Sequence, residues 1–82
     1  MSKWEERPEG LCRSFKFKDF KTAFGFMTRV AFIAEEHKHH PDWHNVYNQV
    51  DIKLNTHDQG GAITDQDRLL ASAIDELHAE MS

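Results

Sequence analysis

The strongest constraint on the fold comes from the segment Phe20–His37, in which apolar side chains recur with the period of an α-helix. Asp19, immediately before it, is a good N-cap because its carboxylate can accept a hydrogen bond from the first turn. The apolar arc covers about half of the helix circumference, which is more than one core contact needs. We therefore expect one flank to pack on a sheet and the rest on another subunit, the alternative being a core helix with one stray aromatic. The expected subunit contacts are Phe26, Val30, Phe32 and Ile33.

Segments with alternating side chains on either side of this helix predict β-strands. Cys12–Phe17 alternates as a half-buried strand does, and Lys3–Arg7 is its expected hairpin partner. Trp43–Tyr47 and Val50–Thr56 form a second candidate hairpin. Its turn is expected at Asn48-Gln49, because asparagine tolerates positive φ.

Thr64 is a good cap for a second amphipathic helix, whose apolar stripe continues to Met81. The order of elements is then β-β-α-β-β-α. Tight hairpins separated by helices favour an α+β fold, in which a four-stranded antiparallel sheet carries two helices packed on one face. Residues 1–82 are expected to form a single domain, as their number allows.

Composition argues against several classes of protein. The net charge of −4 and the lack of a basic stripe argue against direct nucleic-acid binding. No apolar run is long enough to predict a membrane span, and none near the N-terminus predicts a signal peptide. Cys12 is the only cysteine, which is typical of proteins in a reducing compartment. We therefore expect a cytoplasmic protein.

Histidines cluster just after the first helix, at His37, His39, His40 and His44, and three kinds of site could use them. A metal site is chemically possible, but Pro41 interrupts the helical spacing and no cysteine pair is present. A structural role is also possible, because the negative end of a helix dipole favours histidine. Acid–base catalysis is the third, since an imidazole with a pKa of about 6.5 gives and takes protons near neutral pH. Pro41 fixes the adjacent pair His39-His40 at a helix-to-strand junction, which makes a purely structural role less favourable, but the pair alone stays compatible with a helix end or a metal site.

A longer pattern surrounds this pair, with Glu35-x-x-x-His39-His40-Pro41 followed at fixed intervals by Tyr47, His57 and Asp67. The pattern resembles the signature of the pterin-4a-carbinolamine dehydratase family, and the likeness extends from about Trp4 to Leu77. The resemblance implies an α+β fold and a lyase that removes water from 4a-hydroxytetrahydropterin to give quinonoid dihydropterin. This reaction recycles tetrahydrobiopterin for aromatic amino-acid hydroxylases. It needs neither a metal nor an organic cofactor.

The resemblance also implies a role for each site residue. His39 and His57 would be the acid/base groups on the two faces of the carbinolamine, and His40 would mainly hold the ring. Supporting pocket residues would be Glu35, Trp4 and Asp67. Lys38 and Gln66 depart from the family pattern, and the Lys38 cation would lower the pKa of neighbouring imidazoles. The chain also begins almost at its first strand, so the N-terminal helix of many members is expected to be missing.

A second class of function stays open. The resemblance implies that such a chain can also be a non-catalytic pterin-binding or protein-dimerisation module, because animal members act as dimerisation cofactors through the apolar helix, here residues 20–37. The expected partners are a pterin substrate and further copies of the chain, as a dimer or tetramer. A membrane or nucleic acid is not expected as a partner, and an aromatic amino-acid hydroxylase belongs to the pathway.

Overall fold

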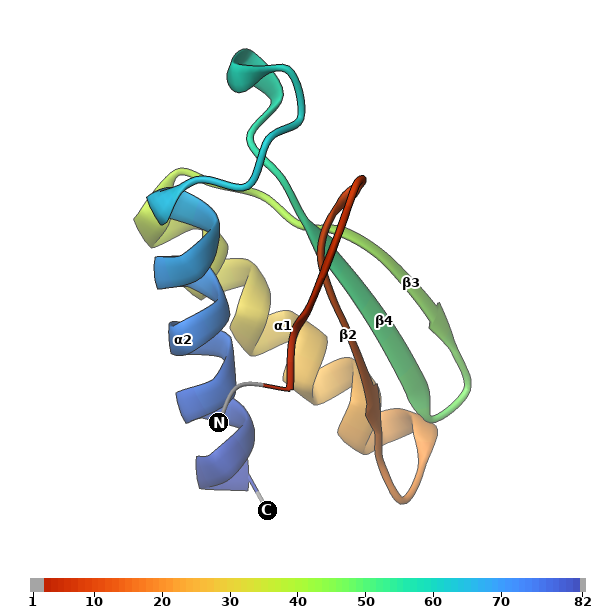
Figure 1. The fold of residues 1–82 in the computed structure, drawn as a ribbon. Helices are drawn as coiled ribbons and strands as arrows, with labels where there is room; N and C mark the ends of the chain where they lie inside the picture. Colours follow the sequence, from red (N-terminus) through yellow and green to blue (C-terminus); the bar gives the residue numbers. More distant parts are fainter. Residues whose placement is uncertain (1–2, 82) are drawn as a thin grey trace.

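The structure, a computed structural model, describes residues 3–81. These residues form two layers (Figure 1). One layer is a four-stranded antiparallel sheet in the order β1-β2-β4-β3, and two helices cover one of its faces. The strands are β1 (Glu5–Arg7), β2 (Gly10–Lys16), β3 (Asp42–Val46) and β4 (Gln49–Leu54). The helices are α1 (Phe20–His37) and α2 (Asp65–Met81), with a short 3-10 helix, η1 (His57–Gln59), before α2. The predicted α+β fold is confirmed.

The centre of the sheet is the pair formed by β2 and β4, which runs from Leu11 opposite Leu54 to Lys16 opposite Gln49. Side chains on the helix side of these strands are mostly buried, whereas those on the other side are more exposed. The space between the sheet and the helices is filled by apolar side chains. These include Leu11, Phe15, Val50, Ile52 and Leu54 from the sheet, Ala23, Phe26 and Val30 from α1, and Leu70, Ile74 and Leu77 from α2.

Both helices begin at the predicted caps. The Asp19 carboxylate accepts a hydrogen bond from the backbone N–H of Thr22 at 2.8 Å. At the start of α2, the Asp67 carboxylate accepts one from the backbone N–H of Thr64 at 2.8 Å, which is half of a capping box. Within residues 3–81, neither helix combines the length and the apolar content that crossing a bilayer would require.

The face that α1 buries differs from the one expected. Phe26 and Val30 are completely buried inside the chain, so their assignment to a subunit contact is wrong. They lie four residues apart on the helix row that meets the sheet and α2, together with Ala23 and Ala34. Ile33 is half-buried at the edge of this core. The outward face carries three exposed aromatic side chains instead of one stray ring: Phe20 (46%), Phe24 (53%) and Phe32 (69%).

The turn between β3 and β4 lies one residue earlier than expected. Val46 pairs with Gln49, so the two turn residues are Tyr47 and Asn48. The positive φ falls on Tyr47 (φ 50°) and not on Asn48. Asn48 is fixed by two bonds of 2.8 Å to Phe17: its side-chain amide donates to the Phe17 carbonyl, and the Phe17 N–H donates to the Asn48 carbonyl. This contact outside the hairpin sets the register.

His78 of α2 lies among aromatic rings of the core. Its ring centroid is 4.9 Å from that of Phe15, 5.8 Å from that of Phe17 and 6.0 Å from that of Phe26. Burial lowers the pKa of His78, and the nearby positive charges of Arg13 and Lys3 lower it further, whereas Asp75 opposes them.

We expect the substitution His78→Phe to remove a pH-dependent loss of stability. Because the folded-state pKa lies below the unfolded value of about 6.5, the neutral ring stabilises the fold fully above that pH. This stabilisation is lost as the pH falls through about 6.5 toward the folded-state pKa. The test is urea unfolding of both proteins at about pH 8 and at about pH 5. The urea midpoint of the variant minus that of wild type should be larger at the lower pH. His44→Phe, on the exposed side of β3, is the control. A difference from wild type that is the same at both pH values would contradict the expectation.

Candidate active site

The histidine pair is placed by the way α1 ends, which is a Schellman motif. Lys38 adopts the left-handed conformation (φ 51°, ψ 39°), and its backbone N–H donates to the Glu35 carbonyl at 3.1 Å. The backbone N–H of His39 donates to the Ala34 carbonyl, also at 3.1 Å. These two bonds close the helix and fix the backbone of His39 just before the chain enters β3.

Asp67 is the buried partner of His39. It is completely buried, and its carboxylate accepts hydrogen bonds from Nε2 of His39, from the Thr56 hydroxyl at 2.9 Å and from the Thr64 N–H at 2.8 Å. Burial alone would raise the pKa of Asp67, but these hydrogen bonds outweigh it and hold the pKa below its usual value. Asp67 is therefore ionised at neutral pH and can only accept. Nε2 of His39 is therefore the donor in this bond, and Nδ1 is the second ring nitrogen.

His40 has its own carboxylate partner at the surface. Nε2 of His40 lies 2.6 Å from Oε1 of Glu35, and both side chains are exposed. Because water screens an exposed pair of this kind, it adds little to the stability of the fold. Its effect is to hold the His40 ring in one orientation, with Nδ1 away from the carboxylate.

His39, His40 and His57 line one cavity of about 390 Å³. The pair comes from the end of α1, and His57 from the start of η1, in the loop that projects beyond the sheet (Figure 1). Thr56 closes the base of this loop, because its N–H donates to the Ala62 carbonyl at 3.0 Å. The structure thus brings the three predicted histidines together. The charged side chains around them in the lining are Lys38, Asp42, Lys53 and Asp58.

Two of the three expected supporting residues lie at this site and one does not. Glu35 contacts His40, and Asp67 contacts His39. Trp4, which packs beside β1, instead donates its indole N–H to Asp75 at 2.8 Å and lines a separate groove. The structure therefore does not bring Trp4 to the histidines.

Sequence reasoning named Thr64 as a helix cap but missed that the hydroxyls of Thr56 and Thr64 complete the Asp67 network. The hydroxyls of Thr56 and Thr64 lie 2.6 Å apart, and the Thr56 hydroxyl also donates to Asp67. The position of Thr64, three residues before an acidic residue at a helix start, was a usable signal for its backbone contact. Nothing in the sequence indicated that Thr56, two residues after the end of β4, would reach the same carboxylate.

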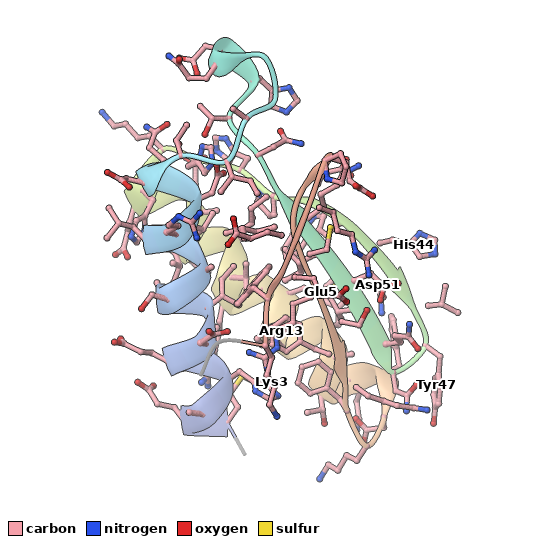
Figure 2. All side chains as sticks on the ribbon, viewed as in Figure 1. Lys3, Glu5, Arg13, His44, Tyr47 and Asp51 are labelled. Carbon is pink, nitrogen blue, oxygen red and sulfur yellow. The ribbon has the colours of Figure 1, made fainter. Side chains whose placement is uncertain are left out.

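A larger depression, of about 530 Å³, lies on the face of the sheet away from the helices, where Figure 2 shows His44 and Asp51. Its polar side chains bond to one another: Ser14 donates to Asp51 at 2.6 Å, and Lys53 lies 3.3 Å from Asp42. The smaller cavity differs in that one of its imidazoles, His39, has a buried carboxylate partner, which makes it the candidate site. In residues 3–81, no three histidine, cysteine, aspartate or glutamate side chains converge closely enough to hold a metal ion.

Comparison with known proteins gives the family. The model of the family described as "Pterin 4 alpha carbinolamine dehydratase" matches residues 1–77. The chain belongs to this family. Two bacterial relatives named "Putative pterin-4-alpha-carbinolamine dehydratase" agree with this. The protein of a Bradyrhizobium species is 51% identical over 84 residues, covering 100% of this chain and 84% of the relative. The protein of Rhodopseudomonas palustris is 53% identical over 77 residues, covering 94% and 75%.

Solved structures agree with the carbinolamine dehydratase fold. The transcriptional coactivator/pterin dehydratase of Brucella melitensis has a TM-score of 0.84 and 45% identity, over 90% of this chain and 80% of that one. A pterin dehydratase-like protein described as a RuBisCO assembly factor of the α-carboxysome has a TM-score of 0.73. At 22% identity, over 93% and 87% of the two chains, it shows the fold alone. The resemblance noted in the sequence is confirmed at the level of family and fold.

Proposed function

We propose that this chain is an active carbinolamine dehydratase that uses histidine acid–base chemistry. The observation that carries the proposal is the buried Asp67 carboxylate, which bonds Nε2 of His39 while His39 lines a cavity. A carboxylate in this position fixes the tautomer and stabilises the imidazolium, which is what a general acid requires. The substrate would be 4a-hydroxytetrahydropterin, the by-product of an aromatic amino-acid hydroxylase, and the reaction would recycle tetrahydrobiopterin in the cytoplasm.

The proposed step removes one molecule of water. The lone pair of N5 forms the double bond to C4a while the bond between C4a and the hydroxyl breaks. The imidazolium of His39 gives its Nδ1 proton to the departing hydroxyl, which leaves as water. The proton on N5 passes to a base on the other side of the ring, for which His57 is the candidate, and quinonoid dihydropterin results. Exchange with solvent then restores both imidazoles.

His57 and His40 have separable roles in this scheme. His57 is exposed on η1, where water can carry away the proton that it accepts. His40 is held by Glu35 and would hold the pterin ring with its second nitrogen. No step needs a group that the chain does not supply, because N5 provides the electron pair.

Turnover is the direct test. A hydroxylase that releases the carbinolamine can be coupled to the purified chain, and the decay of the carbinolamine absorbance followed between about pH 6 and pH 8. We expect the decay to accelerate in proportion to the concentration of the chain. Decay at the uncatalysed rate throughout this range would contradict the proposal and favour a non-catalytic module.

We also propose that copies of the chain associate through the outward face of α1, as a dimer or tetramer. Three exposed phenylalanines follow one row of this helix at intervals of four or eight residues: Phe20, Phe24 and Phe32. The rings of Phe20 and Phe24 lie 5.7 Å apart and form a continuous apolar surface. Exposed apolar surfaces of this kind mark contact sites.

The combined substitution Phe24→Glu and Phe32→Glu should yield a monomer, because it places charges in the proposed contact. Sedimentation velocity should show wild type as a larger species at the same concentration. Leu69→Glu on α2, where Leu69 is 62% exposed, is the control and should sediment as wild type does. A monomeric wild-type protein would refute the association.

A further inference from the structure

Lys38 combines an uncommon backbone conformation with a position at the cavity. Its φ of 51° lies in the left-handed region, where glycine is the usual residue at the end of a helix. A side chain there is disfavoured, because its Cβ crowds the backbone. Such outliers cluster at functional sites. Lys38 directly precedes the histidine pair and lines the same cavity, so its side chain borders the site.

The charge of Lys38 is not neutralised by the protein. Two cations line the cavity, and the ammonium of Lys53 lies 3.3 Å from the carboxylate of Asp42. Lys38, in contrast, takes part in none of the ion pairs found among residues 3–81. Asp58 lines the cavity from η1 and is the other charged side chain of the lining. The Lys38 ammonium is therefore left to water or to a ligand that supplies a negative charge.

The cavity is large enough for more than the reacting ring. Its volume of about 390 Å³ lies within the range of small-ligand sites, which is about 300–1,000 Å³. In the proposed step the reacting atoms, C4a and N5, lie near Nδ1 of His39. A substituent on the neighbouring carbon, C6, then has room to extend toward the exposed edge of the cavity, where Lys38 lies.

We propose that Lys38 binds an anionic group, a carboxylate or a phosphate, on the C6 substituent of the pterin, so that the site prefers anionic pterins to neutral ones. This inference rests on the proposed function and names its substrate class. A lysine ammonium is a point charge that suits either group. Because Lys38 is exposed, the expected preference is modest, about three- to tenfold in affinity.

Fluorescence titration with three stable pterins tests the inference without turnover. The probes are 6-hydroxymethylpterin, which is neutral, its phosphate ester, and pterin-6-carboxylate. Wild type should bind one or both anions about three- to tenfold more tightly than the neutral probe, and added salt should reduce this ratio. The two anionic arms distinguish a phosphate from a carboxylate. In Lys38→Gln the ratio should fall to about one, whereas Lys21→Gln, an exposed lysine of α1, should keep the wild-type ratio.

A second variant separates binding from folding. Lys38→Gly relieves the left-handed conformation, so its urea midpoint should rise while its preference for anions falls. Equal affinities of wild type for all three probes, or a ratio that survives in Lys38→Gln, would overturn the inference. Dehydration of a neutral carbinolamine without any preference for anions would overturn it and leave the proposed function standing. Failure to bind any pterin and to accelerate dehydration would overturn both.

Discussion

The substitution His39→Ala is expected to slow dehydration of 4a-hydroxytetrahydropterin by about 10²- to 10⁴-fold, the range typical of losing a general acid–base group. Among the three histidines that line the cavity, His39 is the one whose Nε2 bonds a buried carboxylate. Adding His40→Ala should reduce the rate to the uncatalysed one. The measurement is the decay of the carbinolamine absorbance, with circular dichroism to confirm folding.

His37→Ala is the matched control, because His37 ends the same helix but is exposed, and Nδ1 of its ring lies 3.0 Å from the Ile33 carbonyl oxygen. It should keep nearly the wild-type rate. Asp67→Asn should lower kcat/KM by about 10- to 100-fold, since an amide cannot stabilise the imidazolium as a carboxylate does. Asp65→Asn, at an exposed position at the start of α2, should leave kcat/KM unchanged. Full activity in His39→Ala would rule out its role as the acid.

The substitution Gly10→Ala is expected to lower the free energy of unfolding by about 3 kcal/mol, from a steric clash and a disfavoured backbone conformation together. Gly10 has φ 142°, and a Cβ built there would lie 2.4 Å from the carbonyl oxygen of Leu54. That carbonyl belongs to β4. Relieving the clash would therefore require β2 to move away from β4, with which it pairs at the centre of the sheet.

Gly25→Ala provides the matched comparison. Gly25 lies within α1, and a Cβ there would meet no atom within 4 Å. Alanine should therefore stabilise the helix by about 1 kcal/mol. Urea unfolding of the two variants should give shifts of opposite sign. Shifts of the same sign would contradict the close approach of β2 and β4 at Gly10.

Local signals were sufficient to predict α1, from its cap at Asp19 to its end at His37, because capping and periodicity depend on residues close in sequence. The same holds for the backbone contact between Thr64 and Asp67. The buried face of α1 could not be predicted in this way. Apolar residues covered half of its circumference, and only the position of the sheet decided that Phe26 would face inward and Phe24 outward.

Prediction of the site from the sequence was limited in the same way. Spacing and resemblance predicted that His39, His40 and His57 would meet, and they line one cavity. The partner that defines the tautomer of His39 lies 28 residues away, and its contact depends on how α1 packs against α2. The expectation that Trp4 would lie at the histidines failed for a similar reason. Its position follows from the edge location of β1 and the contact with Asp75, which local patterns do not encode.

Thr56 has one role through its backbone and another through its side chain, and this limits how the loop can vary. Its carbonyl accepts the N–H groups of Gln59 and Gly61, both at 3.0 Å, and so shapes the segment that presents His57. Its hydroxyl supports Asp67, the partner of His39. One residue therefore sets the geometry of both proposed proton-transfer groups. Insertions or grafts are best placed at the tip of the loop, near Gly60, since a change at its base would disturb both histidines together.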